Sequence, residues 1–402
     1  MLPPPPAPPR GRPRWQVVTG AGACVLALVA VSVGVGLSHR DAPLTPQQRA
    51  ALAASRARVV LELPRLQAWI AGDRGLQWKH PVTPEVLSDA DFVKALDSGA
   101  DGGTSTSADD PDDVGTTFAA MGLVKSADSF YSADSSATNS DVVGFYDDTS
   151  KRLVVRGTAW TPTMEYTLVH ELTHALQDQN FGLSRIRAAV RTDDESALTR
   201  RALIEGDAER VADHYYDEQP AAWQDAVDAA EGSAPPASEP IVDTYEALPY
   251  AFGESFVDGL FAVGGNAAID QAFHAPPSTS QQLLHPAEWI DGERPAPAAL
   301  AFPAAPPGDV ADKGVLGQLG LWAAVEGRDP KPADAAKLDG WAGDAYVATH
   351  GDSGACFVDE LRFDSTRSRT SGLAFLGPWI SAEHIAALDE GDRAVRLSAC
   401  RG

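Results

Sequence analysis

The chain has 402 residues, 44% of them hydrophobic, so it is long enough for one large or two modest domains with a sizeable core. Its formal net charge is −24. A chain this acidic repels phosphate backbones, which excludes nucleic acid as an expected partner.

The N-terminal segment predicts a membrane anchor. Residues 1–16 are rich in proline and carry three arginines, whereas residues 17–37 contain no charged side chain. As a helix, the uncharged run spans about 32 Å, enough to cross a hydrocarbon core of roughly 30 Å. Arginines before the run place residues 1–16 in the cytoplasm and residues 38–402 outside it. No Ala-x-Ala site follows the run, so we favour a retained anchor over a cleaved signal peptide.

The first helix after the anchor is expected to begin at Thr45-Pro46. Threonine is a good capping residue, and proline is tolerated in the first turn of a helix. We expect this helix to run to about Glu62 and to stop or kink at Pro64, because proline disrupts a helix interior.

Strand-forming segments precede the central motif of the chain. A strand is expected within residues 78–87, followed by a short helix capped by Ser88. Residues 142–146 and Arg152–Arg156 are both β-prone, and a polar loop separates them. This pattern predicts a β-hairpin.

A helix from Thr161 to about Asp178 carries the motif His-Glu-Leu-Thr-His. His170 and His174 are four residues apart, so both imidazoles project from the same face of the helix and can bind one metal ion. Glu171 lies beside the first ligand and can act as a general base on a water that the metal polarises. Its apolar neighbours predict that this helix is buried, where two imidazoles and a carboxylate are costly without a partner.

Glu205 is the best candidate for a third ligand, because a catalytic zinc site usually has three protein ligands and an open position. It lies on an expected helix over residues 193–216, with Gly206 beside it to permit close helix packing. Asp207 and Glu209 are rival ligands. Glu209 can instead hydrogen-bond a ligand imidazole from outside the metal site.

Three other functions of the two histidines and the carboxylate remain open. Two histidines and a carboxylate also suit non-haem iron, although both histidines on one helix with an adjacent glutamate favour zinc hydrolysis. A zinc hydrolase acting on a non-protein or cell-wall peptide substrate has the same residues. A catalytically inactive envelope-binding protein is the alternative from a different class.

The motif followed by a helical glutamate is similar to the gluzincin group of zinc metallopeptidases. More narrowly, the chain resembles a poorly characterised family of bacterial and archaeal membrane-linked metallopeptidases. The resemblance rests on GFYD at residues 144–147, HELTHALQDQ at 170–179, ALIEGDA at 202–208, LHP at 284–286 and WAGDAY at 341–346. It covers most of residues 59–360, and the chain departs from the family pattern at Gln281, where an acid is common.

The resemblance implies an α+β, zincin-like fold and a peptide or protein substrate. A mixed sheet with an edge-strand hairpin would pack on the helix of His170. A helical segment with Glu205 and a mainly helical C-terminal lobe would follow. Arg152–Arg156 is then the edge strand expected to pair with the substrate backbone.

Outside the motif, His285 and Tyr250 are candidates to stabilise the oxyanion of the transition state. The alternatives are a structural histidine in a proline-rich turn and a tyrosine packed in the core. Cys356 and Cys400 are expected to form a disulfide if this region lies outside the cytoplasm. The alternative is two free thiols.

Overall fold

A computed structural model of the chain describes residues 44–97, 114–133, 142–157, 159–188, 194–231, 237–292, 300–327, 332–352 and 354–402. The expected anchor at residues 17–37 lies outside this part. No helix within the described ranges is both long and apolar enough to span a membrane.

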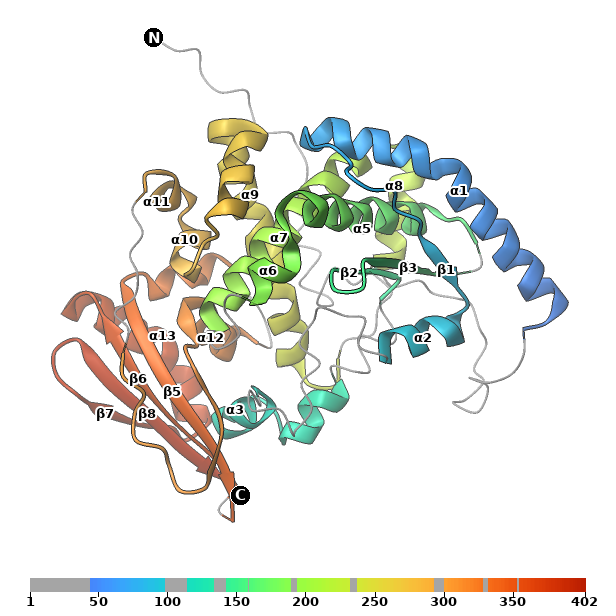
Figure 1. Ribbon diagram of the computed structural model, residues 1–402. Helices are drawn as coiled ribbons and strands as arrows, with labels where there is room; N and C mark the ends of the chain where they lie inside the picture. The colour runs from blue at the N-terminus through green and yellow to red at the C-terminus, as the bar shows by residue number, and fades with distance from the viewer. Residues whose placement is uncertain are drawn as a thin grey trace, which may run out of the picture.

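The described chain is a mixed α+β structure with more helix than strand (Figure 1). Its elements, in chain order, are α1 (Pro46–Arg74), β1 (Glu85–Leu87), α2 (Asp89–Asp97), α3 (Val114–Met121), β2 (Gly144–Asp147), β3 (Arg152–Arg156), α5 (Pro162–Phe181), α6 (Leu183–Ala188), α7 (Asp194–Asp217), α8 (Ala221–Glu231), α9 (Pro240–His274), α10 (Ser280–Leu284), α11 (Pro286–Ile290), β4 (Asp309–Gly314), α12 (Gly317–Glu326), the 3₁₀ helix η4 (Pro332–Leu338), β5 (Trp341–Gly351), β6 (Gly354–Phe363), α13 (Thr366–Ala382), β7 (Ala386–Asp389) and β8 (Ala394–Arg401).

Helix α1 begins where the sequence predicts, but it continues through Pro64 to Arg74. Thr45 caps it, with its side chain accepting a hydrogen bond from the backbone N–H of Gln48 at 3.2 Å. The N–H that Pro64 lacks would have bonded the carbonyl of Val60, on a part of the helix that faces solvent. Water can satisfy that carbonyl, and buried side chains on both sides of Pro64 hold the helix against the core.

The three-stranded sheet has the order β1-β3-β2, which corrects the expected edge strand. The predicted hairpin forms, with β2 antiparallel to β3. However, β1 pairs in parallel with the other side of β3, so β3 is central and β2 is the edge next to the hairpin. The expected strand within residues 78–87 shrinks to Glu85–Leu87, because Pro81 and Pro84 cannot donate to a ladder.

Helix α5 packs against β2 and β3, and it is buried on almost every side. The Thr161 side chain caps its start, accepting from the backbone N–H of Met164 at 3.1 Å, and Gly182 ends it in a left-handed conformation. A Cβ atom on Gly144 of β2 would lie 2.8 Å from the Thr167 side chain, so the edge strand lies close against this helix.

Helices α7 and α9 approach each other at two glycines. A Cβ on Gly206 would lie 2.1 Å from the carbonyl carbon of Gly253, and a Cβ on Gly253 would lie 2.0 Å from the carbonyl oxygen of Ala202. These distances exclude any side chain at either position. Gly206 therefore permits the close helix approach that its place beside Glu205 predicts.

The C-terminal third contains a five-stranded antiparallel sheet in the order β4-β5-β6-β8-β7, which the sequence did not predict, although helices still outweigh strands in the described chain after Glu205, as expected (Figure 1). Helices α3, α12 and α13 pack against this sheet. Strand β5, which lies between β4 and β6, lacks an alternating pattern of apolar and polar residues because it is buried on both faces and rich in alanine and glycine. A disulfide joins Cys356 on β6 to Cys400 on β8.

Candidate metal centre

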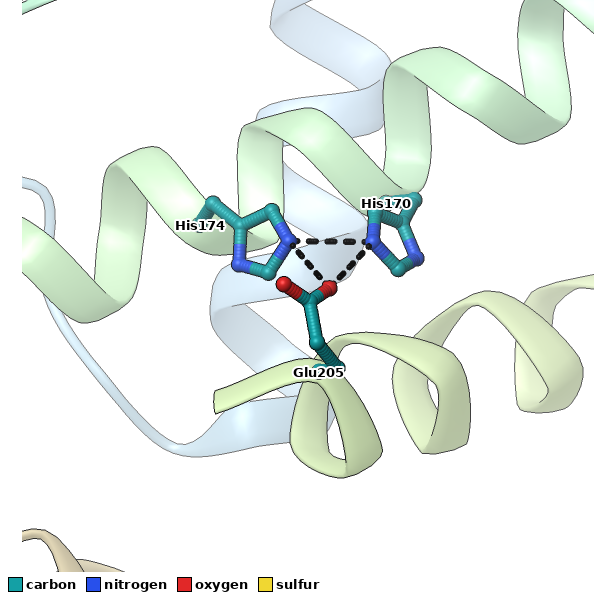
Figure 2. Close-up of side chains that lie close together, drawn as sticks. All are labelled: His170, His174 and Glu205. Atoms are coloured by element: carbon teal, nitrogen blue, oxygen red, sulfur yellow. Dashed lines mark hydrogen bonds and ion pairs between the residues drawn. The ribbon is translucent and has the colours of Figure 1, made fainter. Parts of the chain in front are cut away.

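His170 and His174 from α5 and Glu205 from α7 converge on one point (Figure 2). The Nε2 atoms of the two histidines are 3.0 Å apart. The Glu205 carboxylate oxygen Oε2 lies 3.1 Å from His174 Nε2 and 3.4 Å from His170 Nε2. These side chains are 8–9% exposed, so the group is almost enclosed by protein. It can hold a metal ion.

The spacing of these three atoms fits a small tetrahedral cation. Zinc ligands at about 2.0–2.1 Å in tetrahedral geometry lie roughly 3.3–3.4 Å from one another. The separations of 3.0, 3.1 and 3.4 Å are within a few tenths of an ångström of that triangle. Two nitrogen donors and one carboxylate also leave one position open, which is typical of a catalytic zinc site rather than a closed structural one.

Gln177 determines which nitrogen of His174 faces the triad. Its Nε2 atom donates to the carbonyl of Ile204 at 3.0 Å and to Asp207 at 2.9 Å. The remaining amide oxygen therefore accepts from His174 Nδ1 at 2.9 Å, so this nitrogen carries the hydrogen. The lone pair of Nε2 is left for a metal. Our sequence reasoning missed Gln177, whose signal is its place three residues after the second histidine, on the same helix face.

Asp207, a rival ligand on sequence grounds, points away from the triad. Its carboxylate pairs with the fully buried Arg74 of α1 at 2.8 Å, and Arg74 also reaches Asp270 of α9 at 2.8 Å. Asp207 thus links α1 to the amide of Gln177, and through it to His174. The long reach of α1 past Pro64 is what brings Arg74 to this position.

Glu209 lies behind His170, on the side away from the triad. Its Oε1 is 3.8 Å from His170 Nδ1, too long for a hydrogen bond but close enough for attraction. Tyr166 donates to the other oxygen of Glu209 at 3.1 Å. Glu209 is therefore placed to orient His170 rather than to bind the same metal ion.

The charges of this group attract a cation. Burial by itself lowers the pKa of His170, but the hydrogen bond with Glu205 and the charges of Glu209 and Glu171 outweigh it and raise that pKa to about 9. Burial by itself raises the pKa of Glu205, and the two histidines outweigh it, so that pKa falls well below its ordinary value. In the metal-free protein, a proton on His170 therefore supplies the positive charge that the site favours.

Glu171 lies outside the triad, beside the edge strand. Its carboxylate accepts a hydrogen bond from the backbone N–H of Tyr146 on β2. Burial raises its pKa, and the nearby histidines only partly offset this effect. A carboxyl group whose pKa moves from its ordinary value towards neutrality is suited to both accepting and donating a proton.

Of the two candidates outside the motif, the structure brings only Tyr250 to the site. Its ring on α9 has its centroid 6.4 Å from that of His170. Burial and the charge of Glu205 raise the pKa of Tyr250, so its hydroxyl keeps its proton. His285 lies between α10 and α11, where its Nε2 is 3.1 Å from Asp339. Pro286 starts α11 directly after it and fixes His285 in that turn.

Comparisons of the chain with protein-family models, with curated proteins and with solved structures find no match.

Proposed function

We propose that the chain is a zinc-dependent metallopeptidase with a zincin-like fold, in which His170, His174 and Glu205 bind one zinc ion. The observation that carries this proposal is the convergence of the three ligand atoms within 3.0–3.4 Å, with Glu171 directly beside them. Two nitrogens and one oxygen on rigid helices suit zinc. The third ligand from a second helix supports a likeness to gluzincins.

Glu171 moves the proton in this mechanism. A zinc ion held by these three ligands would supply a Lewis acid and would lower the pKa of a water in the open position towards neutrality. The Glu171 carboxylate accepts the proton of the attacking water and later delivers it to the leaving amine. The backbone N–H of Tyr146 holds that carboxylate in place throughout.

Tyr250 is the donor that we assign to the developing oxyanion. Within the described part of the chain, its hydroxyl has no hydrogen-bond partner, although the ring lies beside His170. A protonated hydroxyl held at that place can stabilise the negative charge that grows on the carbonyl oxygen.

The edge strand β2 is the place that we assign to the peptide backbone. Val143 accepts a hydrogen bond from Arg156 of β3 at 2.7 Å, so Gly144 and Tyr146 turn their backbone groups outward. The outward N–H of Tyr146 reaches Glu171, which sets this edge beside the reacting centre. An extended peptide can add to such an edge with little side-chain preference.

We also propose that the catalytic domain lies outside the cytoplasm, held by the anchor at residues 17–37. The disulfide between Cys356 and Cys400 supports this location, since disulfides persist in oxidising compartments. Protease treatment of intact cells should release the domain. Protection until lysis would reverse the proposed topology.

The test of the activity combines metal analysis with peptide cleavage. The purified protein should contain one zinc per chain and cleave members of a peptide library, and a chelator should abolish cleavage until zinc is restored. Iron in place of zinc would indicate a different chemistry. Zinc without cleavage of any peptide would favour a binding protein or a hydrolase of other bonds.

A further inference from the structure

Next to the metal triad, an ion pair between α7 and α9 has no part in the proposed chemistry. Arg201 lies four residues before Glu205 on α7, and Glu246 lies four residues before Tyr250 on α9. Residues at this spacing share one helix face. Because α7 and α9 approach closely at Gly206, the two faces meet beside the triad.

Tyr250 lies close both to Arg201 and to the triad. The guanidinium carbon of Arg201 is 6.0 Å from the centre of the Tyr250 ring, and that ring is 6.4 Å from the ring of His170. Arg201 therefore lies at the side of the site where Tyr250 is assigned to act.

Arg201 retains hydrogen-bonding capacity. Its Nη2 donates to Glu246 at 2.9 Å, and this is its one hydrogen bond to the residues that the structure describes. A guanidinium carries five N–H donors in a planar fork that matches a carboxylate. The side chain is 27% exposed, so a ligand can reach the remaining donors.

Arg201 is a positive group in surroundings that are mostly negative. Glu205 belongs to the triad, Glu171 and Glu209 lie beside it, and the chain as a whole carries a charge of −24. A substrate carboxylate entering here meets repulsion from these acids. Arg201 is the cation among the main charges that act on Tyr250.

We infer that Arg201 binds a carboxylate of the peptide substrate within about two residues of the bond that is cleaved. This inference rests on the proposed peptidase function. Four residues of α7 separate Arg201 from Glu205 by about 6 Å along the helix axis. An extended peptide advances about 3.3–3.6 Å per residue, so one or two residues cover that separation. The carboxylate is either the C-terminal group of a peptide or an aspartate or glutamate side chain.

The test measures binding and cleavage separately. The zinc-loaded full-length protein with Glu171→Gln, purified in detergent, is titrated with three libraries of N-acetylated octapeptides. One library ends in a free carboxylate, one in an amide, and one in an amide with a single aspartate or glutamate at varied positions. The same libraries are given to the protein with Glu171 intact, and products are identified by mass spectrometry.

Arg201→Met and Arg201→Lys are compared with Arg58→Met in each background. Arg58 of α1 forms an ion pair of the same length, with Glu62 at 2.9 Å, and its loss changes the net charge equally. Zinc content and thermal midpoint verify that each variant is folded. Arg201→Lys preserves the charge beside Glu246 if the methionine variant does not fold.

At least one carboxylate library should bind about 10- to 100-fold more tightly than the plain amide library, as expected for a charge-assisted hydrogen bond. Arg201→Met should bring this ratio close to one, Arg201→Lys should lower it, and Arg58→Met should leave it unchanged. Preference for the free-acid library identifies the C-terminal carboxylate, and preference for the acidic amide library identifies a side chain. Equal binding of all three libraries, or a preference that survives in folded Arg201→Met, overturns the inference. Selective binding without cleavage overturns the peptidase proposal alone.

Discussion

Two buried carboxylates in different parts of the molecule have pKa values that are shifted in opposite directions. Glu205 of α7 faces two imidazoles, and its pKa falls well below the ordinary value. Asp359 of β6 is fully buried in the C-terminal sheet, and neither of its carboxylate oxygens has a hydrogen-bond partner among the described residues. Burial, with Asp344 and Glu360 as like-charged neighbours, raises its pKa well above the ordinary value.

This difference separates a site that is ready for a cation from a group that is merely enclosed. A buried carboxylate without a partner favours its neutral form, since nothing compensates its charge. Glu205 keeps its charge because histidines converge on it, and those same histidines are able to bind metal. Burial of an acid is thus no sign of function by itself. The neighbouring groups determine whether the buried carboxylate keeps its charge.

The largest expected effect comes from Glu171→Gln. This change keeps the size of the side chain and removes its basicity, so cleavage should fall by about 10²–10⁴-fold while zinc remains bound. Rates on a peptide found by library screening, together with metal analysis, test this expectation. A variant that cleaves at nearly the rate of the unchanged protein would show that Glu171 is not the base.

Glu205→Gln tests whether the charged carboxylate of the comparison binds the metal ion. Removing the charged ligand should weaken zinc binding by at least about 100-fold, which is more than the 10–100-fold typical of residues that only orient a ligand. Competition with a chromogenic chelator measures the affinity. Glu209→Gln is the matched control on the same helix, and a larger loss there would move the ligand role to Glu209.

The pH dependence of zinc binding should follow the proton on His170. Its pKa of about 9 in the metal-free protein means that His170 is protonated at pH 7 and must lose this proton to bind a metal. Zinc affinity should therefore rise about tenfold per pH unit between pH 6 and 8. Calorimetry in buffers of different ionisation enthalpy should detect about one released proton at pH 7. Affinity independent of pH would contradict this account of His170.

Asp359→Asn should have the smallest effect, and it should be stabilising. The raised pKa keeps the carboxyl protonated in the folded protein at pH values where the unfolded chain has already released its proton. The unchanged protein therefore loses stability as pH rises above about 4, the ordinary value for aspartate. At pH 7 the variant should gain about 1–3 kcal/mol in the free energy of unfolding, and at pH below about 4 the gain should disappear.

Asp344→Asn is the control for this prediction in the same sheet. Asp344 is also buried, but it accepts backbone hydrogen bonds from Leu316 at 2.7 Å and from Gly317 at 3.0 Å. The same substitution there should destabilise the protein. Denaturant unfolding of both variants measures the sign of the change in the free energy of unfolding. Changes of the same sign would contradict the contrast between hydrogen-bonded and unpaired carboxylates.

The sequence predicted the elements that carry the site because their signals are local. Helix periodicity puts His170 and His174 on one face, and the capping residue Thr161 marks where α5 begins. The polar loop between two β-prone runs likewise predicts the hairpin of β2 and β3. The expected place of Glu205 on the next helix also rests on a local pattern, and the structure sets its carboxylate against both histidines.

The features that the sequence failed to predict depend on contacts between distant parts of the chain. The central place of β3 depends on pairing with β1, about 70 residues away, and no local signal in β3 specifies that partner. Strand β5 lacks alternation because both of its faces are buried. His285 resembles a functional histidine in its motif, yet its turn faces Asp339 rather than the triad.

The sequence by itself determined the two candidate metal ligands of α5 and the adjacent glutamate, because a helix fixes relative directions over one turn. Only the tertiary structure decided the rest of the site. The packing of α7 against α5 and α9 brings Glu205, Arg201 and Tyr250 to one place, and the reach of α1 delivers Arg74 to the network behind His174. These contacts join residues that are far apart in the chain, so their energies depend on how whole elements pack. Such contacts produce no periodic pattern in the sequence.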